Sequence, residues 1–300
     1  MLILMLFSSI FNYYMGTELE RLYYDDRKQK INLIFSIIIN LAVLVFFKYY
    51  GFLLNTIGGI IGIHIPHPEL SLPIGLSFYT FRNLSYLFDI YLSKVSAQRN
   101  FLTFAVYSTM FPYTSAGPIV RYTDIETQLK RRTINISKFG IGAELFVKGL
   151  AKKVLLADNL SVLYSSICGH PQMSVFTSWL GILAYTMQLY FDFSGYSDMA
   201  IGLGKMLGFD FNKNFDYPYI STSVSEFWRR WHISLGSWFR DYIYIPLGGN
   251  RVSTLKHIRN ILVGIGHLPV CGMVQAGISY YGVFITDSSF YSKNLYFRNI

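Results

Sequence analysis

A chain of 300 residues could form one or two soluble domains, but 52% of it is hydrophobic and only 14% is charged. Soluble globular chains carry about 25% charged residues, so the composition predicts an integral membrane protein. The net charge of +9 has three common explanations: a nucleic-acid partner, an acidic substrate, or the cytoplasmic loops of a membrane protein. Because the charges cluster between long apolar runs, they favour the loops and argue against nucleic acid.

The first half of the chain alternates apolar runs with polar segments. Residues 31–47 form the clearest candidate for a spanning helix. The run at 2–14 is short for a span, which needs roughly 20 residues, so we expect a signal-anchor or the later part of a span. The run at 52–65 contains glycines and is expected to be a short or bent helix. The run at 70–92 contains polar residues and should pack inside protein, and 101–120 is a further apolar stretch.

The connections between these runs differ in charge. Residues 18–30 and 121–138 gather lysines and arginines, and the positive-inside rule predicts that both loops are cytoplasmic. The connection at 64–69 has no lysine or arginine, which suits the outer side.

The second half carries more charge within its helical patterns. Residues 139–166 are too charged for a lipid-exposed span, and an amphipathic or interfacial helix fits better. Residues 176–195 form a strong span. Residues 224–247 are aromatic, basic and helical in pattern, which predicts a re-entrant or in-plane helix. The fold class is therefore all-α: a polytopic transmembrane helical bundle with re-entrant or in-plane helices.

A dense polar cluster lies within apolar sequence at 188–198. A carboxylate at bilayer depth is costly unless it is paired or hydrated, so both acids of this cluster need an explanation. Either they line a water-filled cavity that faces a substrate, or they bond neighbouring helices and arginines. The cavity candidates are Asp192, Ser197 and Asp198. The arginine candidates are Arg229, Arg230 and Arg240.

A second cluster surrounds His232. Three of the four tryptophans lie within 225–241, and on a continuous helix Trp228, His232 and Leu235 would share one face. His232 is a candidate catalytic group. The alternatives are a structural histidine beside tryptophan and a segment that only anchors the chain at the membrane surface.

Other chemistries lack their motifs. The sequence has no P-loop, no His-Glu-x-x-His and no nucleophile elbow. Cys168 and Cys271 have neither metal-site spacing nor a disulfide framework. We therefore expect no metal and no bound cofactor.

Four segments form a recognisable combination. They are Pro73–Phe81 (PIGLSFYTF), Ala116–Tyr122 (AGPIVRY), Tyr190–Ala200 (YFDFSGYSDMA) and Glu226–Ser234 (EFWRRWHIS). Together they resemble the membrane-bound O-acyltransferase family, and within it the alginate O-acetyltransferase-like branch. The turn Ile245–Arg251 favours that branch over the D-alanyl-transferring one. The resemblance runs from about Met1 to Val263 and starts inside a helix, so we expect the front of the family domain to be missing.

The resemblance implies a many-helix membrane fold with a central cavity, through which an acyl group reaches a hydroxyl acceptor. The donor is expected to be a thioester, either acetyl-CoA or an acyl carrier. The expected partners are the lipid bilayer and either a polysaccharide or a second acetyl-transfer protein. The expected location is the bacterial inner membrane, crossed several times.

The resemblance also implies roles for the candidate residues. His232 matches one of two histidines that mark the family, and a histidine with a near-neutral pKa could take the proton of the acceptor hydroxyl. The acids and Ser197 would line the cavity. The three arginines would pair with the acids or with phosphate.

The chain departs from the family at a later Leu-Trp-His-Gly-Ala motif, which holds the histidine usually assigned the catalytic role. Codons that can encode His267 to Ser279, regrouped by two bases, read Leu-Thr-Gly-Leu-Trp-His-Gly-Ala-Gly-Trp-Asn-Phe. We therefore expect a frameshift between about Val263 and His267. Residues 1–263 would then be a partial family domain, and 264–300 an aberrant tail read out of frame, in which His267 has no catalytic role.

On this interpretation the chain is an O-acyltransferase that is impaired or inactive. One alternative is a non-enzymatic membrane channel, transporter or scaffold built on the intramembrane acids and arginines. The other is a pseudogene product without function.

Overall fold

The computed structural model describes residues 2–63, 66, 73, 75–114, 117–170, 174–253, 255–256 and 259–260. Within them all regular structure is helical, which confirms the predicted all-α class. The tail predicted at 264–300 and most of the connection predicted at 64–69 lie outside the described residues. The chain divides into two compact units: the described residues of 1–146 and 200–238, and those of 147–199 and 239–300.

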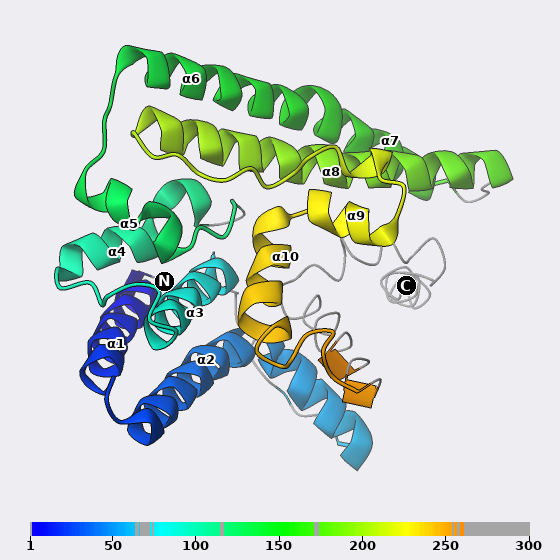
Figure 1. Cartoon of the computed structure of the whole chain (residues 1–300). Coiled ribbons are helices and arrows are strands. Elements are labelled where there is room, and N and C mark those ends of the chain that lie inside the picture. Colours follow the sequence, from blue (N-terminus) through cyan, green and yellow to red (C-terminus); the bar gives the residue numbers. More distant parts are fainter. Residues whose placement is uncertain are drawn as a thin grey trace. The chain divides into compact units, whose positions relative to one another are not determined.

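The α-helices are labelled in Figure 1. In chain order they are α1 (Leu2–Arg21), α2 (Asp26–Ile61), α3 (Leu76–Tyr91), α4 (Phe101–Thr109), α5 (Tyr122–Lys130), α6 (Ile136–Ala151), α7 (Asp158–Cys168), α8 (Val175–Met206), α9 (Val224–Arg230) and α10 (Ile233–Phe239). Short 3-10 turns lie at Phe111–Tyr113 and Pro218–Ile220, and π-helical turns at Lys152–Ala157 and Arg240–Tyr244.

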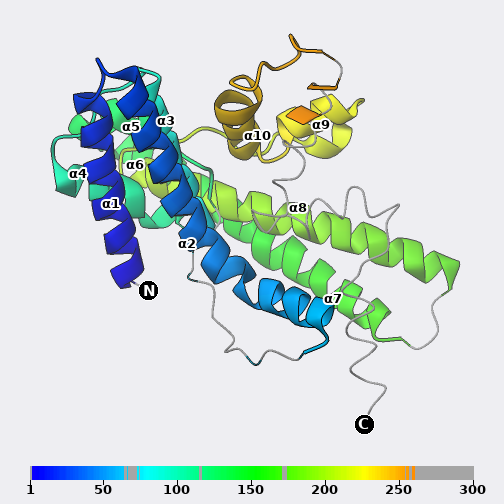
Figure 2. The ribbon, with the colours of Figure 1, turned by 90° about the horizontal axis from the view of Figure 1, so that it is seen from below.

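α1 and α2 form a helical hairpin (Figure 2). The predicted loop at 18–30 is wrong over most of its length, because the last turn of α1 and the first turn of α2 occupy it. Arg21 pairs with Glu18 at 2.8 Å within α1. Asp25 accepts a hydrogen bond from the backbone N–H of Lys28 and so caps the start of α2.

α2 is a single helix of 36 residues, about 54 Å long, where the sequence predicted separate helices at 31–47 and 52–65. Nothing between those segments stops a helix, since Gly51 costs only about 1 kcal/mol there. The helix ends at Gly62, whose φ of 76° is a conformation that favours glycine. Among the described residues, α2 is the one helix both long and apolar enough to cross a membrane.

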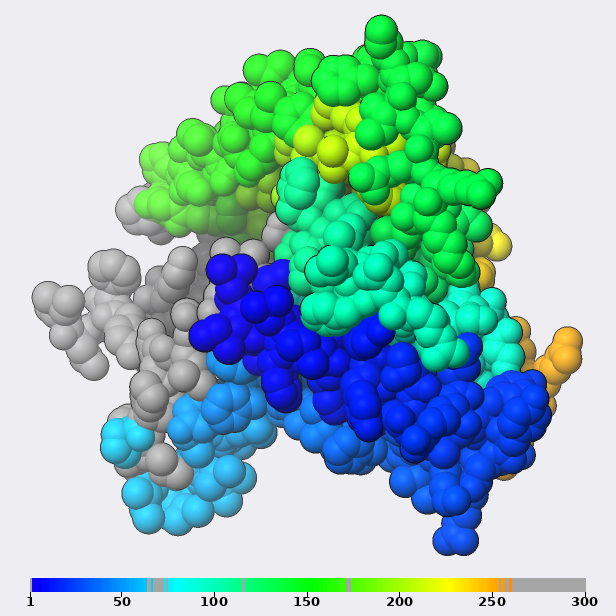
Figure 3. Space-filling view, turned by 90° about the vertical axis from the view of Figure 1, so that its left-hand side faces the viewer, coloured from blue at the N-terminus to red at the C-terminus, as the bar shows by residue number. Residues whose placement is uncertain are grey.

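The hairpin buries polar side chains and exposes apolar ones. Figure 3 shows its blue surface facing the viewer. Asn12 and Asn40 exchange amide hydrogen bonds of 3.0 and 2.8 Å between α1 and α2. The exposed large apolar side chains of α1 include Leu2, Ile3, Leu6, Phe7 and Ile10. This inverted pattern is typical of helices that face lipid and are joined by interhelical hydrogen bonds.

α3 lies in the core of the first unit. Most of its side chains are buried, which confirms for the described part of 70–92 that this run packs inside protein. Arg82 is fully buried, and its guanidinium carbon lies 4.5 Å from the centre of the Tyr113 ring. Asn83 donates to Ser8 of α1 at 3.1 Å and accepts from Ser108 of α4 at 2.9 Å. Polar bonds therefore join α3 to both neighbouring helices.

The regions predicted as an apolar stretch at 101–120 and a loop at 121–138 each contain a short helix. α4 has nine residues and is capped by Asn100, which accepts hydrogen bonds from two backbone N–H groups. α5 also has nine residues, and Asp124 accepts a hydrogen bond from the backbone N–H of Arg121 at its start. Neither helix is long enough to cross a bilayer.

α6, a π-helical turn and α7 follow one another without a break over the region predicted as one amphipathic helix, 139–166. The span predicted at 176–195 lies within α8, which has 32 residues, but among the described residues only α2 meets the combined length and hydropathy expected of a membrane-spanning helix. Glycines bring α6 and α8 close together. A Cβ atom on Gly142 would lie 2.6 Å from the carbonyl oxygen of Gly202, and one on Gly149 would lie 2.5 Å from that of Gly195.

Candidate active site

His232 lies in a break between α9 and α10. Each helix has seven residues, or about 10 Å, so neither can cross a bilayer. The predicted helix over 224–247 is interrupted at Trp231 and His232, so the expected shared face of Trp228, His232 and Leu235 is wrong. Trp231 is extended, and His232 has a φ of 42°. A positive φ at a non-glycine residue is uncommon and needs firm support from its surroundings.

That support comes from the segment that precedes α9. The backbone N–H of Asp216 donates to the carbonyl oxygen of Arg230 at 2.9 Å. The backbone N–H of Ile233 donates to the carbonyl oxygen of Asn214 at 2.9 Å. The two bonds lie on either side of His232 and hold its backbone in place.

The side chain of Asn214 joins the same site. Its Oδ1 atom lies 3.0 Å from Nδ1 of His232 and accepts hydrogen bonds from the N–H and the hydroxyl of Ser234, at 3.1 and 2.9 Å. The Ser234 hydroxyl oxygen accepts a hydrogen bond from the backbone N–H of Ile119 at 3.0 Å. No site role was predicted from sequence for Asn214, Ser234 or Ile119, although Ser234 and Ile119 lie in segments that carry the resemblance. The available signal was an asparagine within the aromatic stretch 209–219, where a buried amide needs partners.

Aromatic rings surround the imidazole. Phe215 stacks on His232 with ring centres 6.3 Å apart, and Trp231 packs edge-on against Phe215. His232 is 2% exposed, and burial lowers its pKa to about 3 because the charged imidazolium loses its hydration. The ring is therefore neutral at pH 7 and a weaker base than the near-neutral histidine predicted from sequence.

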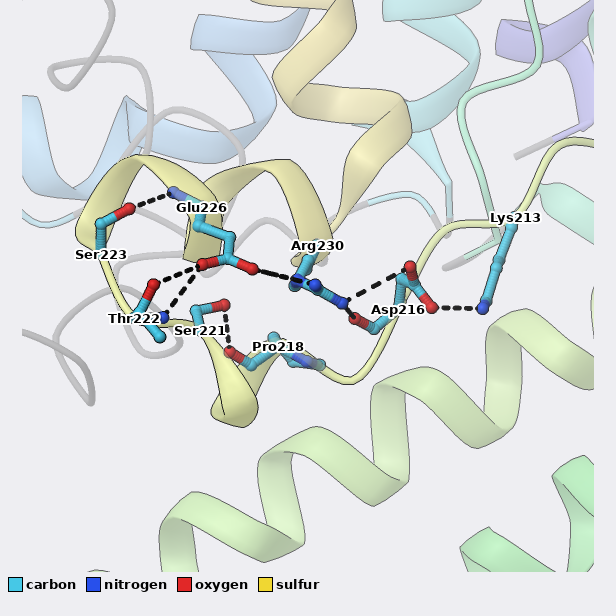
Figure 4. Close-up of polar contacts among 8 residues, drawn as sticks. All are labelled: Lys213, Asp216, Pro218, Ser221, Thr222, Ser223, Glu226 and Arg230. Atoms are coloured by element: carbon cyan, nitrogen blue, oxygen red, sulfur yellow. Dashed lines mark hydrogen bonds and ion pairs between the residues drawn. The ribbon is translucent and has the colours of Figure 1, made fainter.

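A polar network fixes α9 just before the break (Figure 4). Ser223 caps the helix by accepting from the backbone N–H of Glu226 at 3.1 Å, and Glu226 accepts in return from the N–H of Thr222 at 3.0 Å. Arg230 donates to Glu226 at 3.0 Å and to the backbone oxygen of Asp216 at 3.2 Å. This arginine therefore anchors the helix that leads into His232.

The two acids of α8 pair with lysines. Lys153 lies 2.8 Å from Asp192, and Lys152 lies 2.6 Å from Asp198. Both lysines come from the π-helical turn that follows α6. The structure therefore shows lysines as partners of these acids, and the pairing with Arg229, Arg230 or Arg240 stays a prediction. Both lysines lie within the charged segment 139–166, but no sequence pattern linked them to the acids.

The candidate site residues fall in different units of the chain. The first unit holds His232 with Arg230 and the exposed Arg229. The second holds the two acids, the buried Ser197, and an exposed Arg240 that pairs with its neighbour Asp241 at 2.7 Å. A single cavity lined by His232 and the acids stays a prediction. The site that the structure assembles consists of His232, Asn214 and Ser234.

His232, Asn214 and Ser234 are uncharged hydrogen-bonding groups, so they provide no charge that would hold an ion. A neutral imidazole can accept a hydrogen bond from an O–H group, and its aromatic surroundings exclude water. The serine and the asparagine are uncharged, so their bonds orient the ring without adding charge to it.

Comparisons with known proteins agree on one family. The profile of the membrane-bound O-acyltransferase family (MBOAT) matches residues 1–263. The chain is 45% identical over 259 residues to the "Probable alginate O-acetylase AlgI" of Pseudomonas aeruginosa, covering 85% of this chain and 50% of that protein. It is 34% identical over 286 residues to a peptidoglycan O-acetyltransferase of Helicobacter pylori, covering 85% and 54%.

A third relative is named for the transfer of D-alanine rather than acetate. The chain is 30% identical over 194 residues to a teichoic acid D-alanyltransferase of Bacillus subtilis, covering 61% of this chain and 47% of that protein. The chain thus spans about half the length of the curated relatives that it matches.

Proposed function

Because the chain belongs to the membrane-bound O-acyltransferase family, we propose that it transfers an acetyl or other acyl group from a thioester to a hydroxyl of an exported polysaccharide. Relatives named alginate O-acetylase and peptidoglycan O-acetyltransferase support this acyl group and this class of acceptor. Acetyl-CoA or an acyl carrier is the donor. The acetyl group reaches the polysaccharide directly or through a second acetyl-transfer protein.

The reaction is an acyl transfer between two atoms. The oxygen of the acceptor hydroxyl attacks the thioester carbonyl carbon, the C–S bond breaks, and the hydroxyl proton ends on the departing sulfur. The products are an O-acyl ester and a free thiol. His232 accepts the hydrogen bond of the acceptor hydroxyl and aligns its oxygen for attack, which is a positioning role.

One observation carries this proposal: a buried histidine whose Nδ1 contacts Asn214 and Ser234 lies within the segment that matches the family. A histidine that only anchored a surface helix would gain nothing from such confinement. Because burial lowers the pKa of His232, we propose that this histidine orients the acceptor hydroxyl and that a stronger base removes the proton.

We further propose that the chain crosses the bacterial inner membrane several times. The supporting observations are the apolar length of α2 and the inverted pattern of α1, which exposes apolar side chains and buries polar ones. α1 has 20 residues, about 30 Å of helix, which matches the hydrocarbon core. The α6–α8 contacts through glycine add the close packing common between helices in lipid.

His232→Ala should lower acetyl transfer by roughly 10- to 100-fold, because a misplaced acceptor loses about that much in rate. The assay uses membranes that contain the full chain, acetyl-CoA labelled in its acetyl group, and either a polyuronate or peptidoglycan as acceptor. Labelled ester in the polysaccharide is measured.

The matched control is His170→Ala, which changes an exposed histidine that follows α7. It should leave the rate unchanged. Equal rates for the two variants and the unmodified chain would refute the role of His232, and labelled polysaccharide that never exceeds the background would refute the transfer itself.

A further inference from the structure

We propose that Asn214 and Ser234 are positioning residues that hold His232 in the tautomer with its proton on Nδ1, so that Nε2 is the atom that receives the acceptor hydroxyl. The tautomer follows from the hydrogen bonds of the site alone. Only the use of Nε2 rests on the proposed function.

The orientation of the Asn214 amide is the first step. A backbone N–H can only donate, and that of Ser234 points at the Asn214 side chain at 3.1 Å. The atom that receives it must therefore be the carbonyl oxygen Oδ1. The flipped amide would place its NH₂ group against this N–H and lose the bond.

The direction of the Ser234 hydroxyl is the second step. Its oxygen accepts the backbone N–H of Ile119 at 3.0 Å, and its proton then lies toward Oδ1 of Asn214 at 2.9 Å. The hydroxyl oxygen also lies 3.4 Å from Nδ1 of His232. It thus ties the segment around Ile119 to the amide that faces the histidine.

The histidine proton is the third step. Nδ1 of His232 lies 3.0 Å from Oδ1 of Asn214, an oxygen that can only accept. Nδ1 must therefore donate, which places the proton there. In a neutral imidazole the other nitrogen then carries the lone pair, so Nε2 is the atom that can accept a hydrogen bond.

The burial of the site strengthens the preference for the tautomer with its proton on Nδ1. Asn214 and His232 are 1% and 2% exposed, so water cannot easily replace a lost partner. A buried N–H without an acceptor costs about 1–3 kcal/mol. The backbone contacts that hold His232 at positive φ keep the ring beside this amide.

The test is ¹⁵N NMR of the full chain in lipid nanodiscs, with ¹⁵N-labelled histidine, at pH 7. Protonated and unprotonated imidazole nitrogens have well-separated shifts. The chain has six histidines, and the spectrum of His232→Gln identifies the lost signals. We expect His232 to show a protonated Nδ1 and an unprotonated Nε2. Asn214→Ala should reduce the preference for this tautomer by about tenfold, the effect of one hydrogen bond.

Asn214→Asp supplies a variant of nearly the same shape. Its carboxylate still accepts from Nδ1, so the tautomer should persist, and the added negative charge should raise the pKa of His232. Ser234→Ala should weaken the tautomer preference, whereas the matched control Ser237→Ala, in the same helix, should not.

The proposal is overturned if the unmodified chain carries the proton on Nε2, or if Asn214→Ala and Asn214→Asp leave the His232 signals unchanged. Acetyl-transfer rates of the same variants separate the two proposals. The expected tautomer without any transfer activity would support the positioning network and count against the proposed function only.

Discussion

A chain read in the other frame after Val263 should transfer acetyl groups about 100- to 10,000-fold faster than the present chain. The restored segment would contain Leu-Trp-His-Gly-Ala, whose histidine is expected to serve as the general base, and a general base contributes about two to four orders of magnitude. Burial lowers the pKa of His232, which makes it a weaker base than an ordinary histidine. Insertion of one base pair after the codon for Val263 creates the restored chain, and labelled acetyl transfer in membranes measures it.

The control for this comparison is the restored chain with its new motif histidine replaced by alanine. Its rate should fall back to that of the present chain. Sequencing the locus gives an independent check, because codons at 267–279 that cannot be regrouped into the motif would rule out the frameshift. Equal activity of the present and restored chains would show that the added segment supplies no base.

Gly142→Ala should destabilise the first unit by about 1–3 kcal/mol, the usual cost of an overpacked contact. The new Cβ atom would lie 2.6 Å from the carbonyl oxygen of Gly202 and 2.9 Å from the backbone nitrogen of Met206. Both atoms belong to the backbone of α8, so a side-chain rotation cannot relieve the clash. The midpoint of thermal unfolding in detergent micelles should fall accordingly.

The matched control lies two residues earlier in the same helix. A Cβ atom on Gly140 would have nothing within 4 Å, and alanine is favoured over glycine in a helix by about 1 kcal/mol. Gly140→Ala should therefore leave the midpoint unchanged or raise it. If the two variants behaved alike, the close contact between α6 and α8 would be refuted.

Hydrophobic runs located most of the helices, because each run of apolar residues must be buried in protein or lipid. Their ends were harder to predict. The span predicted at 31–47 ends just before Lys48 and two tyrosines, but α2 continues past them, because charged and aromatic residues can cover a helix surface without interrupting its backbone bonds. The prediction of a loop at 18–30 was wrong for a similar reason, because its charged side chains form pairs that are compatible with a helix.

The site was predicted only in part, because long-range contacts decide it. The aromatic segment pointed to His232 as a candidate. The break between α9 and α10 depends on backbone hydrogen bonds with Asn214 and Asp216, which a local sequence pattern does not predict. The partners of the acids were also missed. A lysine and an arginine are equivalent in a charge count, and only the packing of α8 against the π-helical turn selects Lys152 and Lys153.

The reciprocal bonds between Asn12 and Asn40 also bear on how the chain enters a membrane. An amide that enters hydrocarbon alone is costly, whereas two amides that bond each other lose most of that cost. α1 and α2 should therefore insert together as a preassembled pair, and their pairing would set the sliding register between them. α3 and α4 would then pack against this pair, where Asn83 bonds Ser8 and Ser108 bonds Ser9.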